Sequence, residues 1–203
     1  LFRFGLPTGV QGIAMNVGGV LLLRYIGSVA QSAEAQAAYA VGYTELFSLI
    51  TWTSVGLLGA AATVAGQNVG AGKPERAIHC VHVTAGIGLS VAATVAILFL
   101  AIPGQLLGLF GMSEPVVVQI GTQLLHFLSL SGLFVTVALT YTGALQGSGD
   151  TKSPLYISLI SQLVLPIGLC AILNAHRRLE PADIWLAILL GHFTRCVLSI
   201  VRF

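Results

Sequence analysis

Charged residues are scarce in this sequence: they make up 8% of its 203 residues, whereas soluble globular domains carry about 25%. Hydrophobic residues make up 56% of the chain, and several long stretches contain no charged residue at all. So little charge cannot cover a surface that faces water, and each uncharged stretch can hold the roughly 20 apolar residues of a membrane span. These absences exclude a soluble globular domain and predict an integral membrane protein.

Cysteine pairs, basic stripes and catalytic groupings are lacking as well. The cysteines Cys80, Cys170 and Cys196 lie far apart without CxxC spacing, so no disulfide or metal site is predicted. A net charge of +2 without a stripe of Lys and Arg argues against a nucleic-acid partner. No Ser-His-Asp, Cys-His or paired-carboxylate arrangement stands out, so we predict neither an enzyme nor a bound cofactor.

Six apolar runs predict six membrane-spanning helices, because a chain in lipid must satisfy its backbone within helices or a closed barrel. The alternating strands of a barrel are not evident. The predicted helices cover residues 6–29, 39–65, 77–102, 116–141, 155–173 and 184–203. We expect an all-α, six-helix transmembrane bundle that forms one unit over residues 1–203. The first residue is not Met and no polar tail follows the last run, so both ends are expected to lie inside a longer protein.

The basic residues of the loops predict the orientation in the membrane. Lys73 and Arg76 fall in the second loop and Lys152 in the fourth, whereas Glu34 and Glu114 fall in the first and third. Because cytoplasmic loops carry an excess of Lys and Arg, the second and fourth loops are expected on the cytoplasmic side. We expect the protein in the plasma membrane, or in the inner membrane if it is bacterial.

Four further arginines test that orientation or stand apart from it. Arg177 and Arg178 lie in the fifth loop and disagree with it. Arg24 lies near the outer end of the first span, where a long side chain can extend to the interface. Arg195 sits deeper in the last span and can face a partner helix instead, and its role stays open.

Two loop sequences carry the strongest motif. The stretch from Ala62 to Ala77 reads ATVAGQNVGAGKPERA, the stretch from Gly143 to Pro154 reads GALQGSGDTKSP, and GLPT opens the first span. In this order they resemble the multidrug and toxic compound extrusion (MATE) family over essentially the whole chain. The motif residues are Gly66, Gln67, Asn68, Gly70, Gly72, Pro74 and Arg76 in the first loop and Gln146, Gly147, Gly149 and Asp150 in the second.

The first of these loops is interpreted as a mechanical element. It is not a phosphate-binding Walker A loop, since its lysine is followed by proline rather than Ser or Thr. Gly66, Gly70 and Gly72 permit a sharp exit from a helix, Pro74 favours the start of the next, and Arg76 can reach lipid phosphate or backbone carbonyls. We favour this structural role over direct substrate contact.

Glycines at helical spacing suggest close helix packing, because small residues let helices approach in lipid. For the GxxxG pairs at the loops we favour the simpler interpretation that they end helices, and we assign close packing to glycines within the spans. The loop pairs are Gly66 with Gly70 and Gly143 with Gly147; the packing glycines are Gly18, Gly19, Gly56 and Gly59.

The resemblance implies a twelve-helix transporter whose two six-helix bundles rock about a central cavity. Such a protein exports organic cations, drugs or other amphipathic compounds in exchange for protons or sodium. The chain would supply helices seven to twelve, with an amino-terminal six-helix lobe, membrane lipids and small cationic or amphipathic substrates as its partners. The alternatives are a lipid-linked oligosaccharide flippase of the same superfamily and a membrane scaffold subunit without transport.

Glu45 is the most deeply placed carboxylate of the sequence and the main candidate for coupling. A carboxylate in hydrocarbon must be protonated, paired or beside water, and a proton or a lipophilic cation could compete for it. A position near the outer headgroups or a hydrogen bond between helices explains Glu45 equally well. The sodium-coupled branch carries acids in its seventh and tenth helices, but the region of Met15 and Asn16 has none, so a sodium site in this lobe is not expected.

Polar and aromatic residues within the spans are further candidates for contact with substrate. Gln119, Gln123 and His126 recur at i, i+4 and i+7, one face of one helix, which either lines a wet cavity or packs against another bundle. We favour the cavity. Gln11 and Asn16 could add polar groups and Tyr39, Tyr43 and Tyr141 cation-attracting rings, although an interfacial position also explains Tyr39.

Overall fold

The computed structural model describes the backbone of residues 2–203 and the side chains from residue 5 onward, and the helices extend over nearly all of it. The described residues contain no strand. The elements are α1 (Phe2–Ile26), α2 (Ser32–Tyr39), the π-helical η1 (Ala40–Leu46), α3 (Ser48–Gly70), α4 (Pro74–Ala101), α5 (Pro103–Gly108), α6 (Pro115–Gly147), α7 (Lys152–Ser158), the π-helical η2 (Leu159–Val164), α8 (Leu165–His176) and α9 (Pro181–Arg202).

Six helical segments are long and apolar enough to cross a membrane. Two of the six are composite: α2, η1 and α3 follow one another in the second, and α7, η2 and α8 in the fifth. The prediction of an all-α bundle with six spans is therefore confirmed. The second helix begins at Ser32 rather than at residue 39, because Ala35, Ala38 and their neighbours form a helical face that packs on the bundle despite the polar residues between them.

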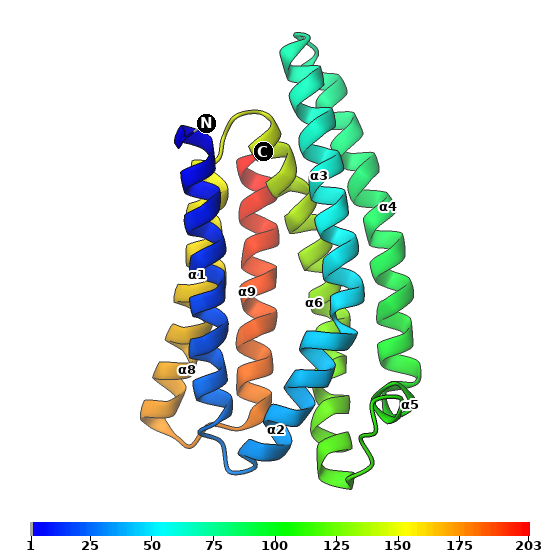
Figure 1. Cartoon of the computed structure of the whole chain (residues 1–203), viewed down its shortest axis with the longest axis vertical. Coiled ribbons are helices and arrows are strands. Elements are labelled where there is room, and N and C mark those ends of the chain that lie inside the picture. Colours follow the sequence, from blue (N-terminus) through cyan, green and yellow to red (C-terminus); the bar gives the residue numbers. More distant parts are fainter. Residues whose placement is uncertain (1) are drawn as a thin grey trace.

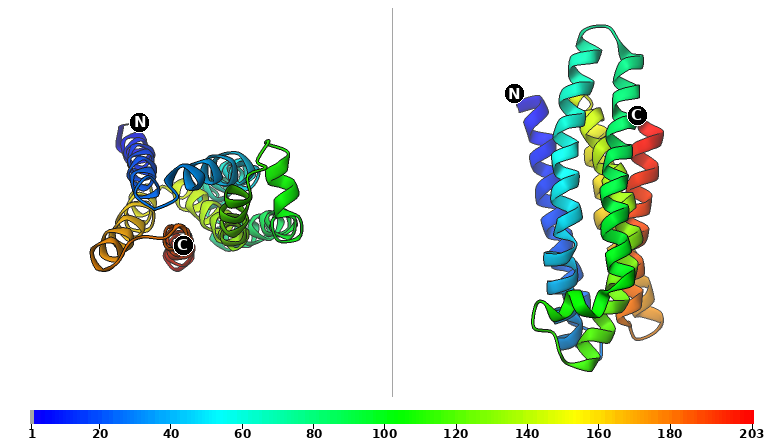
Figure 2. Two further views of the ribbon diagram at one scale, coloured as in Figure 1. Left: turned by 90° about the horizontal axis from the view of Figure 1, so that it is seen from below. Right: turned by 90° about the vertical axis from the view of Figure 1, so that its right-hand side faces the viewer.

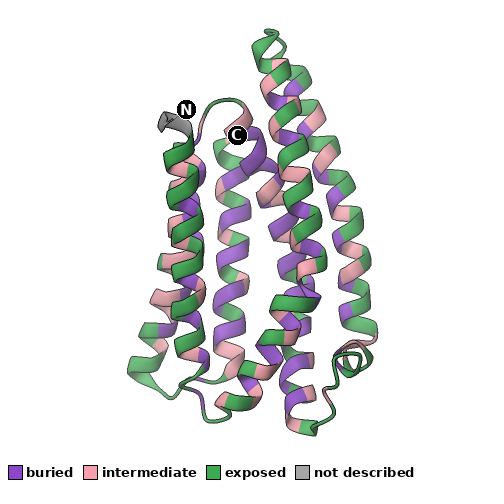
Figure 3. Ribbon diagram, in the orientation of Figure 1, coloured by how far each residue is buried: buried purple, intermediate pink, exposed green. Residues whose placement is uncertain are grey.

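The six segments run side by side along the long axis of the molecule (Figure 1). The α3–α4 hairpin projects beyond the other helices at the end where the α6–α7 loop and both termini lie, as both side views show (Figures 1 and 2). The central helix is α6, which is the most buried of the six segments and contacts α2, α3, α4 and α9. Buried residues accordingly gather on α6 and α9, while α1, α3 and α4 carry much of the exposed surface (Figure 3).

Glycine and proline set the turns between the helices. Gly72, Gly111 and Gly149 have φ values of 70°, 75° and 97°, the left-handed region that glycine enters without a steric penalty. At Gly72 the backbone N–H of Lys73 donates to the carbonyl of Asn68, which closes α3 with a Schellman motif, and Pro74 occupies the first turn of α4. The structure thus gives the turn to Gly72, whereas Gly70 is still the last residue of α3.

Helices α3 and α6 cross closely at a pair of glycines, Gly143 and Gly147. A Cβ added to Gly143 would lie 2.1 Å from the carbonyl oxygen of Leu58, and one added to Gly147 would lie 2.0 Å from that of Ala62. Gly147 is the last residue of α6, as expected of a pair that ends a helix, but both glycines also serve close packing against α3. Gly66 joins the same crossing, with its added Cβ 2.9 Å from the carbonyl oxygen of Gly147.

Of the four glycines that were assigned to packing within the spans, only one lies close to a neighbouring helix. Gly18 lies close to the η2 backbone, where an added Cβ would be 3.0 Å from the carbonyl oxygen of Gln162. Gly19, Gly56 and Gly59 have nothing within 4 Å of an added Cβ, so the packing role expected for them is not met within this chain. Their faces on α1 and α3 are open.

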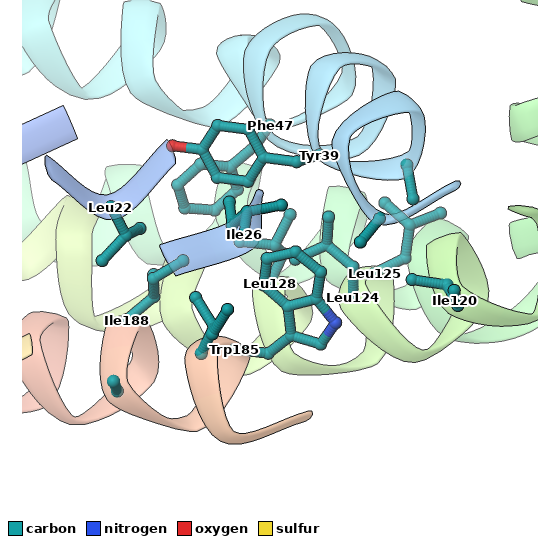
Figure 4. Packing of buried hydrophobic residues seen from close by; sticks show 14 of the residues in the cluster. Leu22, Ile26, Tyr39, Phe47, Ile120, Leu124, Leu125, Leu128, Trp185 and Ile188 are labelled. Carbon is teal, nitrogen blue, oxygen red and sulfur yellow. The ribbon is translucent and has the colours of Figure 1, made fainter. Parts of the chain in front are cut away.

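The main core surrounds α6 and takes residues from α1 to α5, η1, α8 and α9. Its largest fully buried side chains include Trp185 and Phe47, and Leu124, Leu125 and Leu128 of α6 pack among them (Figure 4). A second, smaller cluster between α3, α4 and α6 contains Tyr141 together with Ala65, Val81, Ala85 and Ala144. The aromatic residues of the main core thus line the inner side of η1 and α9.

Candidate functional site

A cavity of about 140 Å³ lies inside the bundle, where α1, the two π-helical segments and α9 meet. Tyr39 and Tyr43 face it from the α2–η1 side, and Gln162 and Pro166 from the η2–α8 side. Its remaining lining residues are Met15, Gly18, Gly19, Leu22 and Ile188. Short π-helical segments occur frequently at functional sites, so the presence of two on one cavity marks it as the candidate site.

The sequence explains why η2 departs from regular α-helix. Proline has no N–H, so Pro166 cannot donate the hydrogen bond that would reach back to the carbonyl of Gln162. Glycines on two neighbouring helices approach the carbonyls of this segment: Gly18 of α1 faces Gln162, and an added Cβ on Gly191 of α9 would lie 2.5 Å from the carbonyl oxygen of Ser161. The irregular backbone is thereby enclosed by protein, as backbone at membrane depth requires.

Aromatic rings form a continuous row beside the cavity. The ring centroids of Tyr39 and Tyr43 are 4.9 Å apart with planes 8° from parallel, and Phe47 follows 5.4 Å from Tyr43. Two residues of α9 join the row, with Trp185 6.1 Å from Tyr39 and His192 5.9 Å from Phe47. The structure therefore brings Tyr39 and Tyr43 together on one surface.

The polar residues expected in the first span have different surroundings. Gln11 is buried, and its Nε2 donates to the Oγ of Ser158 over 2.6 Å, which ties α1 to α7. Asn16 is exposed, and its Nδ2 donates to the carbonyl of Gly12 one turn earlier. Neither side chain lines the cavity, although Met15 beside Asn16 does.

Glu45 lies on η1, two residues after Tyr43, but its side chain is exposed on the surface of the bundle. It forms no ion pair with any residue that the structure describes. The sequence predicted that Glu45 lies deep in a span, and in the structure its side chain is exposed on the outside of the bundle. Within this chain the carboxylate is neither desolvated nor paired, so whatever neighbours it must come from lipid, water or another polypeptide.

The polar face of α6 borders an open groove of about 600 Å³, at the end of the bundle away from the α3–α4 tip. Gln119, Gln123 and His126 are exposed there and face the α1–α2 and α8–α9 loops, including Gln31 and Glu180. Tyr141 lies elsewhere, in the second cluster, with its ring 5.5 Å from that of Phe203. The predicted site residues therefore divide among the cavity, the groove and the second cluster.

The second loop motif is held by a small polar network. Asp150 accepts hydrogen bonds from the backbone and the hydroxyl of Ser153, and Arg202 at the end of α9 donates to both side chains. Partial burial raises the pKa of the Asp150 carboxyl, but the hydrogen bonds and the charge of Arg202 outweigh it and leave the pKa below its usual value. The network connects the α6–α7 turn to α9, a structural role for this motif.

The other motif residues lie on or near the surface of the loops. Asn68 donates from its Nδ2 to the carbonyl of Val64, while Gln67 and Arg76 are exposed and Gln146 is half-buried. In the fifth loop Arg177 pairs with Asp183, whose carboxylate also accepts a hydrogen bond from the backbone of Glu180. One of the two arginines that disagree with the predicted orientation is thus neutralised at the start of α9.

The positive φ of Gly72 allows the turn in the first loop motif to be tested by substitution. Valine at Gly72 must adopt a left-handed conformation that costs about 1–2 kcal/mol for L-residues, so the Gly72→Val variant should unfold at a clearly lower temperature. Gly70→Val is the matched control, because Gly70 ends α3 without a positive φ and has open space around it. Thermal unfolding of both purified variants decides, and equal behaviour would contradict the assignment of the turn to Gly72.

Arg195 is the functional candidate that the sequence left open. It is 3% exposed and lies on α9 one turn beyond His192, which is also 3% exposed. The sequence revealed its depth in the span but not its direction, since α9 is apolar on several sides. A charged residue in a span is itself a signal of function, and that signal was available.

Comparison with known proteins agrees with the architecture. A family model described as MatE matches residues 7–172. The probable multidrug resistance protein NorM of Thermotoga maritima is 25% identical over 203 residues, which cover 100% of this chain and 43% of that protein. The multidrug resistance protein PmpM of Pseudomonas aeruginosa is 26% identical over 100% of this chain and 42% of its own length. The chain thus spans less than half the length of these relatives.

Solved structures show the same fold. A crystal structure of MATE in complex with MaL6 superposes with a TM-score of 0.89 at 18% identity, over 99% of this chain and 45% of that one. The eukaryotic MATE transporter AtDTX14 gives a TM-score of 0.85 at 23% identity, over 99% of this chain and 44% of that one. Because the family model matches most of this multi-pass membrane chain, the chain belongs to the MatE family, the multidrug and toxic compound extrusion transporters.

Proposed function

We propose that this chain is one six-helix lobe of a secondary antiporter that exports amphipathic compounds, including drugs and organic cations, by rocking against a second lobe. The names of the relatives support drug export, and the share of their length that the chain spans supports a second lobe of similar size. The location that we propose is the plasma membrane, or the inner membrane if the source is bacterial. The many large apolar side chains exposed on the bundle suit contact with lipid and with the second lobe.

The observation that carries the proposal is the cavity bordered by Tyr39, Tyr43 and the two π-helical segments. Its volume of about 140 Å³ is below the roughly 300–1,000 Å³ typical of drug-sized sites, so a second lobe would have to complete it. The stacked tyrosines offer flat surfaces on which aromatic or cationic compounds bind. The open small-residue faces of α1 and α3, at Gly19, Gly56 and Gly59, offer room for helices of the second lobe.

Coupling to protons or sodium is the part of the proposal that this lobe supports least. None of its seven acidic residues is buried in the structure. We therefore place the cation site in the second lobe, with Glu45 as the candidate that this chain would contribute if its exposed carboxylate faces that lobe. A lipid-linked oligosaccharide flippase and a scaffold subunit are the outcomes to be separated from this proposal by experiment.

The test is efflux of a fluorescent organic cation from vesicles that contain the protein with both lobes, driven by a pH or sodium gradient. Tyr43→Ala should slow efflux about tenfold, since loss of a cation–π contact of roughly 1.4 kcal/mol corresponds to that factor. Tyr156→Ala is the matched control, because Tyr156 is 60% exposed on α7 and away from the cavity. No efflux from the unchanged protein would reject the proposal in favour of the flippase or the scaffold.

Glu45→Gln in the same vesicles locates the coupling site. Efflux that no longer responds to the gradient would move coupling into this lobe, through Glu45. An unchanged response would place it in the second lobe, as we propose.

A further inference from the structure

Arg195 is the one charged side chain that is buried in the described part of the chain. Its guanidinium makes no ion pair and no hydrogen bond with any described residue, and its Nε is fully occluded. All seven carboxylates of the chain are exposed or only partly buried. Arg177 and Arg202 differ from it, since both pair with aspartates at the loops.

A buried cation without a partner is costly. Removing an ion from water costs several kcal/mol even after the protein relaxes, and only a counter-charge with good hydrogen bonds offsets this. A guanidinium presents five N–H donors in a planar fork that matches carboxylate and phosphate oxygens. The residue therefore calls for an oxyanion, which no residue described by the structure supplies.

Further donors lie on the same side of α9. His192, Arg195 and Ser199 occur at i, i+3 and i+7, which places them on one face of the helix. His192 Nδ1, Arg195 Nε and Ser199 Oγ are all occluded and without a hydrogen-bond partner. This stretch of α9 is thus a buried face of polar atoms that can recognise a ligand, with a cation at its centre.

The aromatic row connects this face to the cavity. Tyr43 lines the cavity and belongs to the row of rings that reaches α9. On the other side Tyr43 stacks toward Phe47, whose ring lies 5.9 Å from that of His192, one turn before Arg195 on α9. A compound whose flat body rests on Tyr39 and Tyr43 would therefore lie at one end of a row of rings that leads to the turn of α9 before Arg195.

We propose that Arg195 binds the oxyanion group, a carboxylate or a phosphate, of amphiphiles that enter the cavity, so that this lobe selects zwitterionic or anionic compounds over simple organic cations. The inference rests on the proposed transport function for its setting and names the substrate class of that site. The group can belong to a transported compound or to the headgroup of an anionic lipid. Both present the same chemistry to the guanidinium.

The experiment measures binding rather than transport, by fluorescence polarisation of a rhodamine free acid and of its ethyl ester with the purified two-lobe protein. The two dyes share the aromatic body and differ in the carboxylate. Arg195→Gln should weaken binding of the acid about tenfold or more, because a hydrogen bond to a charged group contributes about 1.5–3 kcal/mol, and should leave the ester within about twofold. Arg24→Gln is the matched control, since Arg24 is exposed on α1 and should change neither dye.

Equal loss of both dyes, or loss of neither, would overturn the proposal, because a guanidinium that pairs with an acid of the second lobe would not distinguish the acid from the ester. If the Gln variant does not fold, Arg195→Lys keeps the charge but not the fork, and should still weaken the acid selectively. Displacement of the acid by phosphatidylglycerol, in the unchanged protein only, would identify a lipid headgroup as the source; otherwise the source is the transported compound. Selective binding without efflux would leave this inference standing while the proposed transport fails.

Discussion

Replacing Gly147 with alanine is expected to destabilise the protein by about 3 kcal/mol, the upper part of the range for overpacking a tight interface. The new Cβ would lie 2.0 Å from the carbonyl oxygen of Ala62, a backbone atom that cannot rotate aside. Relief requires α3 and α6 to separate, and this crossing is among the main contacts of the bundle. Gly143→Ala should behave alike, because its Cβ would meet the backbone of Leu58 at 2.1 Å.

The control for this prediction is Gly86→Ala on α4. Gly86 is exposed and has nothing within 4 Å of an added Cβ, so alanine there should be neutral or stabilise the helix by up to about 1 kcal/mol. Thermal unfolding and yield of folded protein in mild detergent would be compared for the three variants. A Gly147→Ala protein as stable as Gly86→Ala would show that α3 and α6 do not cross this closely.

The six spans were predictable because lipid leaves the backbone few choices. A run of apolar residues at membrane depth must be helical, so length and apolarity alone predicted the segments that the structure contains. The turn after α3 was accessible for a similar reason, since Gly72 and Pro74 act through their own backbone. Such local features need no knowledge of neighbouring helices.

The sequence could not show whether a side chain points into the bundle or away from it. A span that is apolar on all sides gives no periodic pattern to show which face meets the bundle, so the outward orientation of Glu45 was not predicted. Arg195 likewise stayed unassigned, and the close packing of Gly143 and Gly147 against α3 was not predicted. The role of these residues depends on which helix lies opposite, a fact that only the assembled bundle contains.

The row of aromatic rings beside the cavity also came only in part from the sequence. Tyr39 and Tyr43 were candidates, and their spacing places them on one face. Phe47 and Trp185 were not, because a buried aromatic residue in an apolar span is ordinary. Their place became clear once α9 was found to pack beside η1 and to contribute rings to the same row.

Phe47→Ala is expected to be the second most damaging change. The ring is fully buried, packs on Tyr43 and His192, and lies near Gly132 of α6, whose added Cβ would be 3.5 Å from it. Its removal leaves a cavity that neighbouring helices cannot fill without moving. Full truncation of a buried Phe costs about 3–5 kcal/mol in soluble proteins, and we expect about 2–3 kcal/mol here, since the ring of an unpacked helix would rest in lipid rather than water.

Trp52→Ala provides the comparison. It removes a larger ring from α3, the helix that begins one residue after Phe47, at a position that is 74% exposed. Its unfolding temperature should stay near that of the unchanged protein, while that of Phe47→Ala falls. The Phe47 variant should also weaken dye binding at the cavity, since Tyr43 and His192 lose the ring that spaces them. Stability and binding both unaffected by Phe47→Ala would mean that the junction of η1 and α3 does not pack against α9 through this residue, and the path from the cavity to Arg195 would lose its support.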